Sequence, residues 1–197
     1  MQHAPATLRN RDPILEVLGR VLPANGLLLE IASGTGEHAA YMAPHLPGIA
    51  WQPTDRDSAA LAGIDEAMRA SGCDRILPAI ALDAAASQWP VERTDAIFCC
   101  NMIHISPWAA AEGLFAGAGR FLPSGAQLIL YGPYRRHGAH TAPSNEAFEG
   151  WLKDQDARFG VRCLDTEVKP LAAASGFRLD EIVEMPANNL TVIWRRQ

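Results

Sequence analysis

The chain has 197 residues, which is enough for one well-buried domain and short for two. Hydrophobic residues make up 48% of it and charged residues 20%, a balance that excludes wholesale disorder and is typical of globular proteins. The formal net charge of −5 argues against a nucleic-acid partner, because binding of phosphates needs clustered cations.

Short apolar runs alternate with segments of helical apolar spacing along most of the chain. Asp12 and Pro13, for example, form a typical helix start. The pattern predicts helices over residues 13–21, 37–46, 58–72, 107–121, 145–158 and 167–175. It predicts strands over residues 27–31, 49–53, 75–82, 96–100, 127–131, 178–184 and 190–195.

This alternation predicts an α/β fold with a doubly wound, mostly parallel seven-stranded sheet. The last two predicted strands are joined by only about five residues, too few for a helical crossover, so they must pair antiparallel. Ligands bind to such sheets at the carboxyl ends of the strands. We therefore expect a Rossmann-like sheet that ends in an antiparallel C-terminal hairpin, with a site at its carboxyl edge.

Residues 28–38 are the most informative segment, because an apolar strand there ends in Glu30 and enters a Gly-x-Gly turn. Ala32, Gly34 and Gly36 lie two residues apart. Only small residues there let the backbone bend sharply and let a ligand approach the main chain. The amide N–H groups that open the following helix favour a negatively charged group. The segment therefore indicates a loop that binds a nucleotide cofactor.

Two nucleotide cofactors fit this loop. The turn, with Ala39 behind it and Asp55 about 20 residues further on, matches the dinucleotide fingerprint. S-adenosylmethionine is favoured because Glu30 suits the ammonium group of its methionine part and Asp83 can accept a hydrogen bond from adenine. The chain also lacks the length for a second, substrate-binding domain. A small NAD(P)-dependent oxidoreductase stays open as the enzyme alternative.

The loop Glu30-x-Ala32-x-Gly34-x-Gly36 resembles motif I of class I methyltransferases, which depend on S-adenosylmethionine, with alanine in place of the usual first glycine. Further segments resemble one narrower family, the DUF938 (UPF0585) proteins, which include methyltransferase-like protein 26. The matching segments are Arg9–Pro13, Ala32–His38, Trp51–Asp55, Asn101–Trp108, Tyr131–Tyr134, His140–Asn145 and Met185–Leu190. The resemblance covers most of the chain and implies the fold and the cofactor, but it brings no particular methyl acceptor.

Seven residues at strand ends are candidates for binding the cofactor. They are Glu30, Ala32, Gly34, Gly36, Asp55, Asp83 and Asn101. The first four would hold the methionine end and the ribose. Asp55 would accept hydrogen bonds from two ribose hydroxyls, and Asp83 would bind adenine. Asn101 directly follows the most buried strand, so we expect its side chain at the cofactor pocket. Helix and turn capping are the alternatives for the two aspartates.

A protein that transfers a methyl group from a sulfonium mainly has to align donor and acceptor and to exclude water. A base is needed only where the acceptor must lose a proton. His104, in the loop after the fourth strand, is the first candidate for that catalytic role. His140 and Tyr134 are the second candidates, and a structural role is the alternative for each.

The segment after the fifth strand is rich in polar and aromatic groups that could form a substrate pocket or a lid. Arg135 belongs to a tandem pair of arginines, and a guanidinium fork matches a carboxylate. Asn188 and Asn189 lie in the last turn, which borders the same rim, although asparagine also suits such a turn by itself. We therefore predict a small-molecule methyl acceptor, with an anionic group as a further hypothesis.

The remaining expectations concern organisation and partners. Residues 1–24 would form an N-terminal helical cover within a single domain of residues 1–197. The four cysteines have no metal-ligand spacing, so we expect no metal and free thiols in a reducing cytoplasm. No segment approaches the roughly 18 apolar residues of a membrane span, and the first ten residues do not form a signal peptide. A non-catalytic cofactor-binding or assembly protein stays open, and the oligomeric state is not determined.

Overall fold

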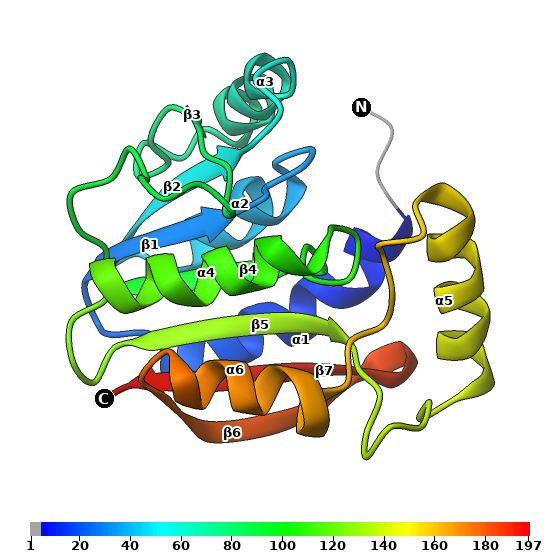
Figure 1. Ribbon diagram of the computed structural model, residues 1–197. Coiled ribbons are helices and arrows are strands. Elements are labelled where there is room, and N and C mark those ends of the chain that lie inside the picture. The colour runs from blue at the N-terminus through cyan, green and yellow to red at the C-terminus, as the bar shows by residue number, and fades with distance from the viewer. Residues whose placement is uncertain (1–4) are drawn as a thin grey trace.

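The computed structural model describes residues 5–197 and contains one seven-stranded sheet with helices on both faces (Figure 1). The strand order is β3-β2-β1-β4-β5-β7-β6, and the pairs β5–β7 and β6–β7 are antiparallel while the others are parallel. The strands are β1 (Gly26–Ile31), β2 (Ile49–Asp55), β3 (Ile80–Ala81), β4 (Ala96–Cys100), β5 (Gln127–Pro133), β6 (Phe177–Met185) and β7 (Asn189–Arg196). The predicted doubly wound sheet with an antiparallel C-terminal hairpin is confirmed.

Two sets of helices cover the sheet, and one helix lies beyond its edge. The helices are α1 (Pro5–Val21), α2 (Glu37–Met42), α3 (Leu61–Ser71), α4 (Trp108–Phe121), α5 (Pro143–Gln155) and α6 (Lys169–Ala174), with short turns η1 (Ala43–His45), η2 (Leu164–Val168) and η3 (Pro186–Asn188). Helices α1 to α3 pack on one face and α4 and α6 on the other, whereas α5 lies past the tip of β5 (Figure 1). None of the helices within residues 5–197 is long and apolar enough to cross a membrane.

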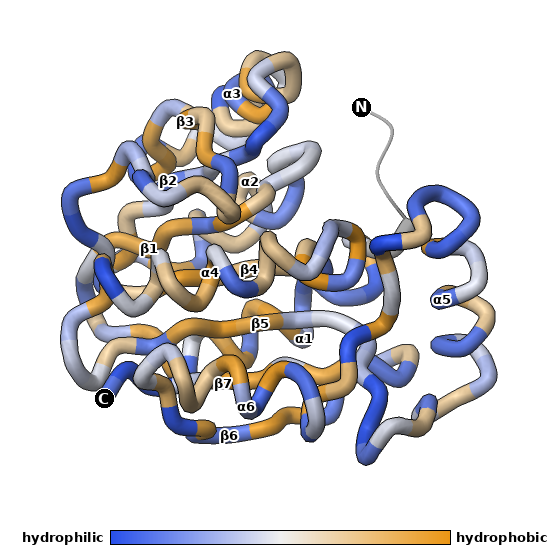
Figure 2. The backbone as a smooth tube through the Cα atoms, in the orientation of Figure 1, coloured by the Kyte–Doolittle hydropathy of each residue, from blue (hydrophilic) through white to orange (hydrophobic). Residues whose placement is uncertain are grey.

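The central strands are apolar on both faces, as expected for parallel strands covered on both sides. Figure 2 shows this as orange stretches through the sheet, in contrast to the largely hydrophilic α5. Side chains alternate along β4, so Phe98 packs with Trp51 beneath α1 to α3, while Ile97 packs with Phe115 beneath α4. Two separate cores thus pack the sheet between its helices, and the parallel strands end at one edge.

Some boundaries differ from the predicted ones for physical reasons. Helix α1 begins at Pro5, so the helix start predicted at Asp12 and Pro13 is wrong. Pro13 removes the hydrogen bond to the carbonyl of Arg9 but does not end the helix. The strand predicted over residues 75–82 shrinks to Ile80–Ala81, with one isolated bridge between Ile76 and Trp51. Pro78 lies between them and has no N–H for a ladder. The helix predicted from residue 167 is preceded by the π-helical turn η2.

Gly117 in α4 allows close packing against an aromatic ring. A Cβ atom added there would lie 2.1 Å from Cζ2 of Trp89, whose ring is stacked on Phe121. We therefore expect Gly117→Ala to lower the free energy of unfolding by about 1–3 kcal/mol, measured by urea denaturation, because the buried indole must move.

Gly63→Ala in α3 is the matched control, because an added Cβ there meets nothing within 4 Å. It should stabilise the protein by up to about 1 kcal/mol through helix propensity. Equal stability of the two variants would contradict the packing interpretation.

Candidate functional site

The turn after β1 is built from residues with a left-handed backbone. Ala32, Gly34 and Gly36 have φ angles of 59°, 61° and 75°. A Cβ on Gly36 would lie 2.7 Å from Cε of Met68, so α3 packs directly on the turn there. At Gly34 an added Cβ would meet nothing within 4 Å. The turn thus has a packed side toward α3 and an open surface at Gly34.

Glu30 lies beneath this turn and is 1% exposed. Its Oε2 atom accepts hydrogen bonds from Ser33 Oγ at 2.8 Å and from Trp51 Nε1 at 3.0 Å. The hydroxyl of Ser33 accepts a bond from the N–H of Thr54, and the hydroxyl of Thr54 donates to the carbonyl of Glu30. Burial raises the pKa of Glu30 to about 7 despite its two donors. Glu30 therefore ties the turn to β2, and its role toward an ammonium group stays a prediction.

A cavity of about 240 Å³ opens at the carboxyl ends of β1, β2 and β3. Four of the predicted cofactor residues line it together: Ala32, Gly34, Asp55 and Asp83. Its other walls are formed by Ile31, Arg56, Leu82, Ala84, Met102, Ile105, Ser106 and Ala110. The cavity thus combines two carboxylates with a mainly apolar lining, which suits a flat ring system that carries hydroxyl and amine donors.

The two carboxylates in this cavity are held by backbone donors. Asp55 accepts bonds from the N–H groups of Gly34 and Asp57, each at 3.0 Å. Asp83 accepts a bond from the N–H of Ala85 at 2.9 Å. Each carboxylate oxygen has a second lone pair, so both groups keep acceptor capacity for a ligand.

A second, larger cavity of about 590 Å³ lies at the ends of β4, β5 and the C-terminal hairpin. We call it the acceptor cavity, and it is lined by Arg9, Asn10, Asn101, Tyr131, Pro133, Ser144, Asn145, Phe148, Pro186, Ala187, Asn188 and Asn189. Three predicted site residues are here, namely Asn101, Asn188 and Asn189. Because Asn101 lines this cavity and the next residue, Met102, lines the smaller one, the two cavities adjoin at the turn after β4.

Helix α5 and the hairpin turn form one connected wall of the acceptor cavity. The amide of Asn145 donates to the carbonyl of Asn188 at 3.0 Å and to Thr141 Oγ1 at 3.1 Å. The amide of Asn188 donates to Ser144 Oγ at 3.3 Å. The sequence predicted α5 as a helix but carried no signal for its position beyond the sheet edge, so Asn145 and Phe148 were missed.

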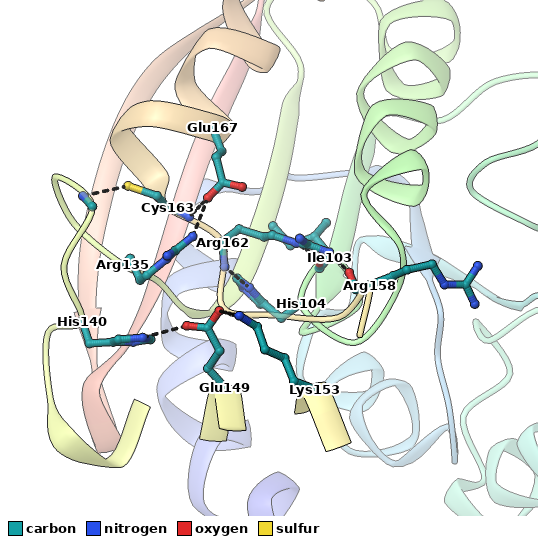
Figure 3. A network of polar contacts seen from close by, with 11 residues as sticks. Ile103, His104, Arg135, His140, Glu149, Lys153, Arg158, Arg162, Cys163 and Glu167 are labelled. Carbon is teal, nitrogen blue, oxygen red and sulfur yellow. Dashed lines mark hydrogen bonds and ion pairs between the residues drawn. The ribbon is translucent and has the colours of Figure 1, made fainter. Parts of the chain in front are cut away.

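His104, the first candidate base, is fully buried and lines neither cavity. Its ring packs edge-on against Tyr134. Its Nδ1 accepts a bond from the N–H of Arg162 at 3.1 Å (Figure 3). This bond assigns the proton of the neutral ring to Nε2. Burial and the charge of Arg162 lower the pKa of His104 to about 3. A role as base would require the bond from Arg162 to open, and it stays a prediction.

The other predicted residues of this region also have structural contacts. Tyr134 is fully buried, which raises the pKa of its hydroxyl far above the ordinary value. His140 Nε2 lies 2.7 Å from an oxygen of Glu149, and Arg135 pairs with Glu167 at 3.0 Å (Figure 3). None of these three predicted residues lines either cavity.

Solved methyltransferase structures share this fold. An O-methyltransferase family 2 protein from Planctomyces limnophilus, solved with apigenin, is similar with a TM-score of 0.77 and 19% identity over 95% of this chain and 62% of its own. An O-methyltransferase family protein from Burkholderia thailandensis is similar with a TM-score of 0.81 and 13% identity. The match covers 98% of this chain and 57% of that protein. CalO1, a methyltransferase of calicheamicin biosynthesis in its SAH-bound form, is similar with a TM-score of 0.74 and 18% identity. The match covers 95% of this chain and 54% of that protein.

These likenesses show that the chain has the class I methyltransferase fold, as predicted. The chain spans only 54% to 62% of the length of the three matched proteins. In addition, the sequence model described as "Protein of unknown function (DUF938)" matches residues 1–196.

Glu30 should make stability depend on pH. Its pKa in the folded protein is raised to about 7 from 4.5, so the folded state keeps a proton that the unfolded chain releases between these values. The contribution of Glu30 to the free energy of unfolding should therefore fall by about 3 kcal/mol as the pH rises through this window, whereas the buried His38 and His104, whose pKa values are lowered, contribute in the opposite direction. Glu30→Gln, whose amide can still accept from Trp51 and Ser33, should lack the Glu30 contribution, so its free energy of unfolding in urea denaturation should rise more steeply with pH than that of the natural protein.

Glu66→Gln is the control, because this carboxylate is exposed on α3. That variant should retain the slope of the natural protein. The same slope in Glu30→Gln would show that another group produces the pH dependence.

Proposed function

The chain belongs to the DUF938 family, and from this membership and the two adjoining cavities we propose that it is an S-adenosylmethionine-dependent methyltransferase acting on a small-molecule acceptor. The observation that carries the proposal is that consecutive residues, Asn101 and Met102, line different cavities. In-line transfer requires donor and acceptor to meet from two sides of one methyl group. Two cavities that adjoin at the end of a central strand provide this arrangement.

The residues of the smaller cavity fit the nucleoside part of the cofactor. Asp55 at the end of β2 would accept from the ribose hydroxyls, and Asp83 after β3 would accept from the adenine amine. The open surface at Gly34 gives the ligand access to the main chain. When bound, S-adenosylmethionine supplies an electrophilic methyl group on a sulfonium. Glu30 would contribute indirectly, because its hydrogen bond with Ser33 holds the turn in its left-handed conformation.

The acceptor cavity would align the acceptor and keep water from the reacting atoms. Arg9 and Asn10 of α1 line it, which supports an N-terminal cover over the site. Tyr131 lines it as well, and burial raises the pKa of this phenol to about 12. The Tyr131 hydroxyl therefore stays protonated at neutral pH and can donate a hydrogen bond to the acceptor.

Asp55→Asn should weaken binding of S-adenosylhomocysteine about 10-fold to 100-fold, measured by isothermal titration calorimetry. An amide in place of the carboxylate loses one acceptor and its charge toward two hydroxyls, and hydrogen bonds to charged groups contribute about 1.5–3 kcal/mol. The variant keeps an oxygen for the N–H of Gly34, so the turn should survive.

Asp57→Asn is the matched control, because Asp57 lies two residues away, is exposed, and caps the N–H of Ala59. Its affinity for S-adenosylhomocysteine should stay unchanged. Absence of heat with the natural protein would contradict the proposal, and tighter binding of NADH would support the oxidoreductase alternative.

A further inference from the structure

We propose that the acceptor cavity binds an aromatic carboxylate and that Arg9, rather than Arg135, pairs with its negative charge. This inference rests on the proposed methyl transfer and names the class of acceptor. It rests on three observations: Arg135 already has an ion-pair partner, Arg9 lines the cavity, and apolar and aromatic side chains form much of its wall.

Arg135 and its neighbour are both engaged within the protein. Arg135 pairs with Glu167 at 3.0 Å, and Arg136 pairs with Asp165 at 2.9 Å. Glu167 also accepts the backbone N–H of Cys163 at 2.7 Å, so this ion pair belongs to the link between the loop after β5 and the turn η2. Neither arginine lines the acceptor cavity. Both guanidinium groups therefore form ion pairs that connect the loop after β5 with the turn η2.

Arg9 is in the opposite situation. Its side chain is exposed and lines the acceptor cavity from α1. Among the cavity-lining residues within the described range 5–197, Arg9 alone carries a formal charge at neutral pH. It makes no ion pair with any other residue of that range. A guanidinium beside an uncharged, partly enclosed cavity favours an anionic ligand, and a planar carboxylate matches its fork.

The walls favour a flat apolar body behind that charge. Phe148 lines the cavity and is stacked on Trp151, with ring centroids 5.8 Å apart and an interplanar angle of 14°. Pro133 and Pro186 add further apolar surface, and Tyr131 lines the same space. Aromatic ligands gain from such contacts beyond the area they bury. The volume of about 590 Å³ lies in the range of pockets for drug-sized molecules.

The asparagines of the cavity shape it without adding charge. Asn145 donates to the carbonyl of Asn188, and Asn189 donates to the carbonyls of Pro186 and Ala187. Asn10 lies 2.9 Å from Nε2 of His38 through its side-chain oxygen. Because these amides are engaged in holding the walls, Arg9 remains the group that distinguishes a charged ligand from a neutral one.

The test compares salicylate with salicylamide, which have nearly the same shape and differ in charge. Binding is followed by saturation-transfer NMR titration, with and without S-adenosylhomocysteine, for the natural protein and for Arg9→Gln, Arg9→Lys and Arg11→Gln. Arg11 is the matched control, because its guanidinium lies 4.0 Å from the ring centroid of Tyr41 and does not line the acceptor cavity.

We expect the natural protein to bind salicylate about threefold to tenfold more tightly than salicylamide, since Arg9 is solvent-exposed and its pairing is screened. Arg9→Gln should abolish this preference, Arg9→Lys should keep part of it, and Arg11→Gln should keep it fully. The affinity for S-adenosylhomocysteine should be unchanged in all three variants, which also shows that they are folded.

The inference is overturned if neither compound binds, if both bind equally, or if Arg9→Gln retains the preference. Inorganic phosphate that displaces salicylate at equal concentration would overturn the aromatic part, because the cavity would then recognise charge alone. Salicylate binding that depends on Arg9, without any binding of S-adenosylhomocysteine, would instead reject the proposed function and keep the anion site.

Discussion

Three residues with a left-handed backbone after β1, held by hydrogen bonds to one buried carboxylate, fix the position of the smaller cavity at the carboxyl ends of β1 and β2. Ala32, Gly34 and Gly36 turn the chain within one loop, and Gly36 leaves room for α3 to pack on it. Glu30 fastens this turn to β2 through Ser33. Because the turn cannot shift without breaking these buried bonds, Asp55 and the open surface at Gly34 keep a constant relation to each other.

The second cavity is assembled by parts of the chain that are far apart in sequence. Helix α1 contributes from the beginning of the chain, α5 from the segment after β5, and the turn η3 from the C-terminal hairpin. Strand β6 makes this possible, because it returns the chain to the carboxyl edge, where η3 leads into the antiparallel β7 beside β5. Polar contacts such as His140 with Glu149 and Asn145 with Asn188 then hold α5 in place. The two cavities therefore differ in origin: one is local to the first strands, the other depends on the whole fold.

Much of the architecture was readable from the sequence, and so was the part of the candidate site that lies on strand ends. The alternation of elements predicted the sheet, and the positions of Asp55 and Asp83 predicted two carboxylates in one cavity. The same reasoning chose Arg135 for an anion and His104 for a base, because both follow strands that end near the site. In the structure Arg135 is paired with Glu167 and His104 is enclosed against Tyr134. The position of a residue in the sequence does not show which ion-pair or packing partners it meets in the folded protein.

By itself, the sequence determined the period and order of the elements, the antiparallel hairpin and the small residues of the turn at Gly34. These follow from local rules, since apolar spacing, short connections and left-handed geometry act over a few neighbouring residues. Only the tertiary structure decided that Arg9 and Phe148 share a cavity with Asn189. Their meeting depends on how α1 and α5 pack around the sheet edge, and contacts between distant segments are set by the burial of whole surfaces, which no local pattern encodes.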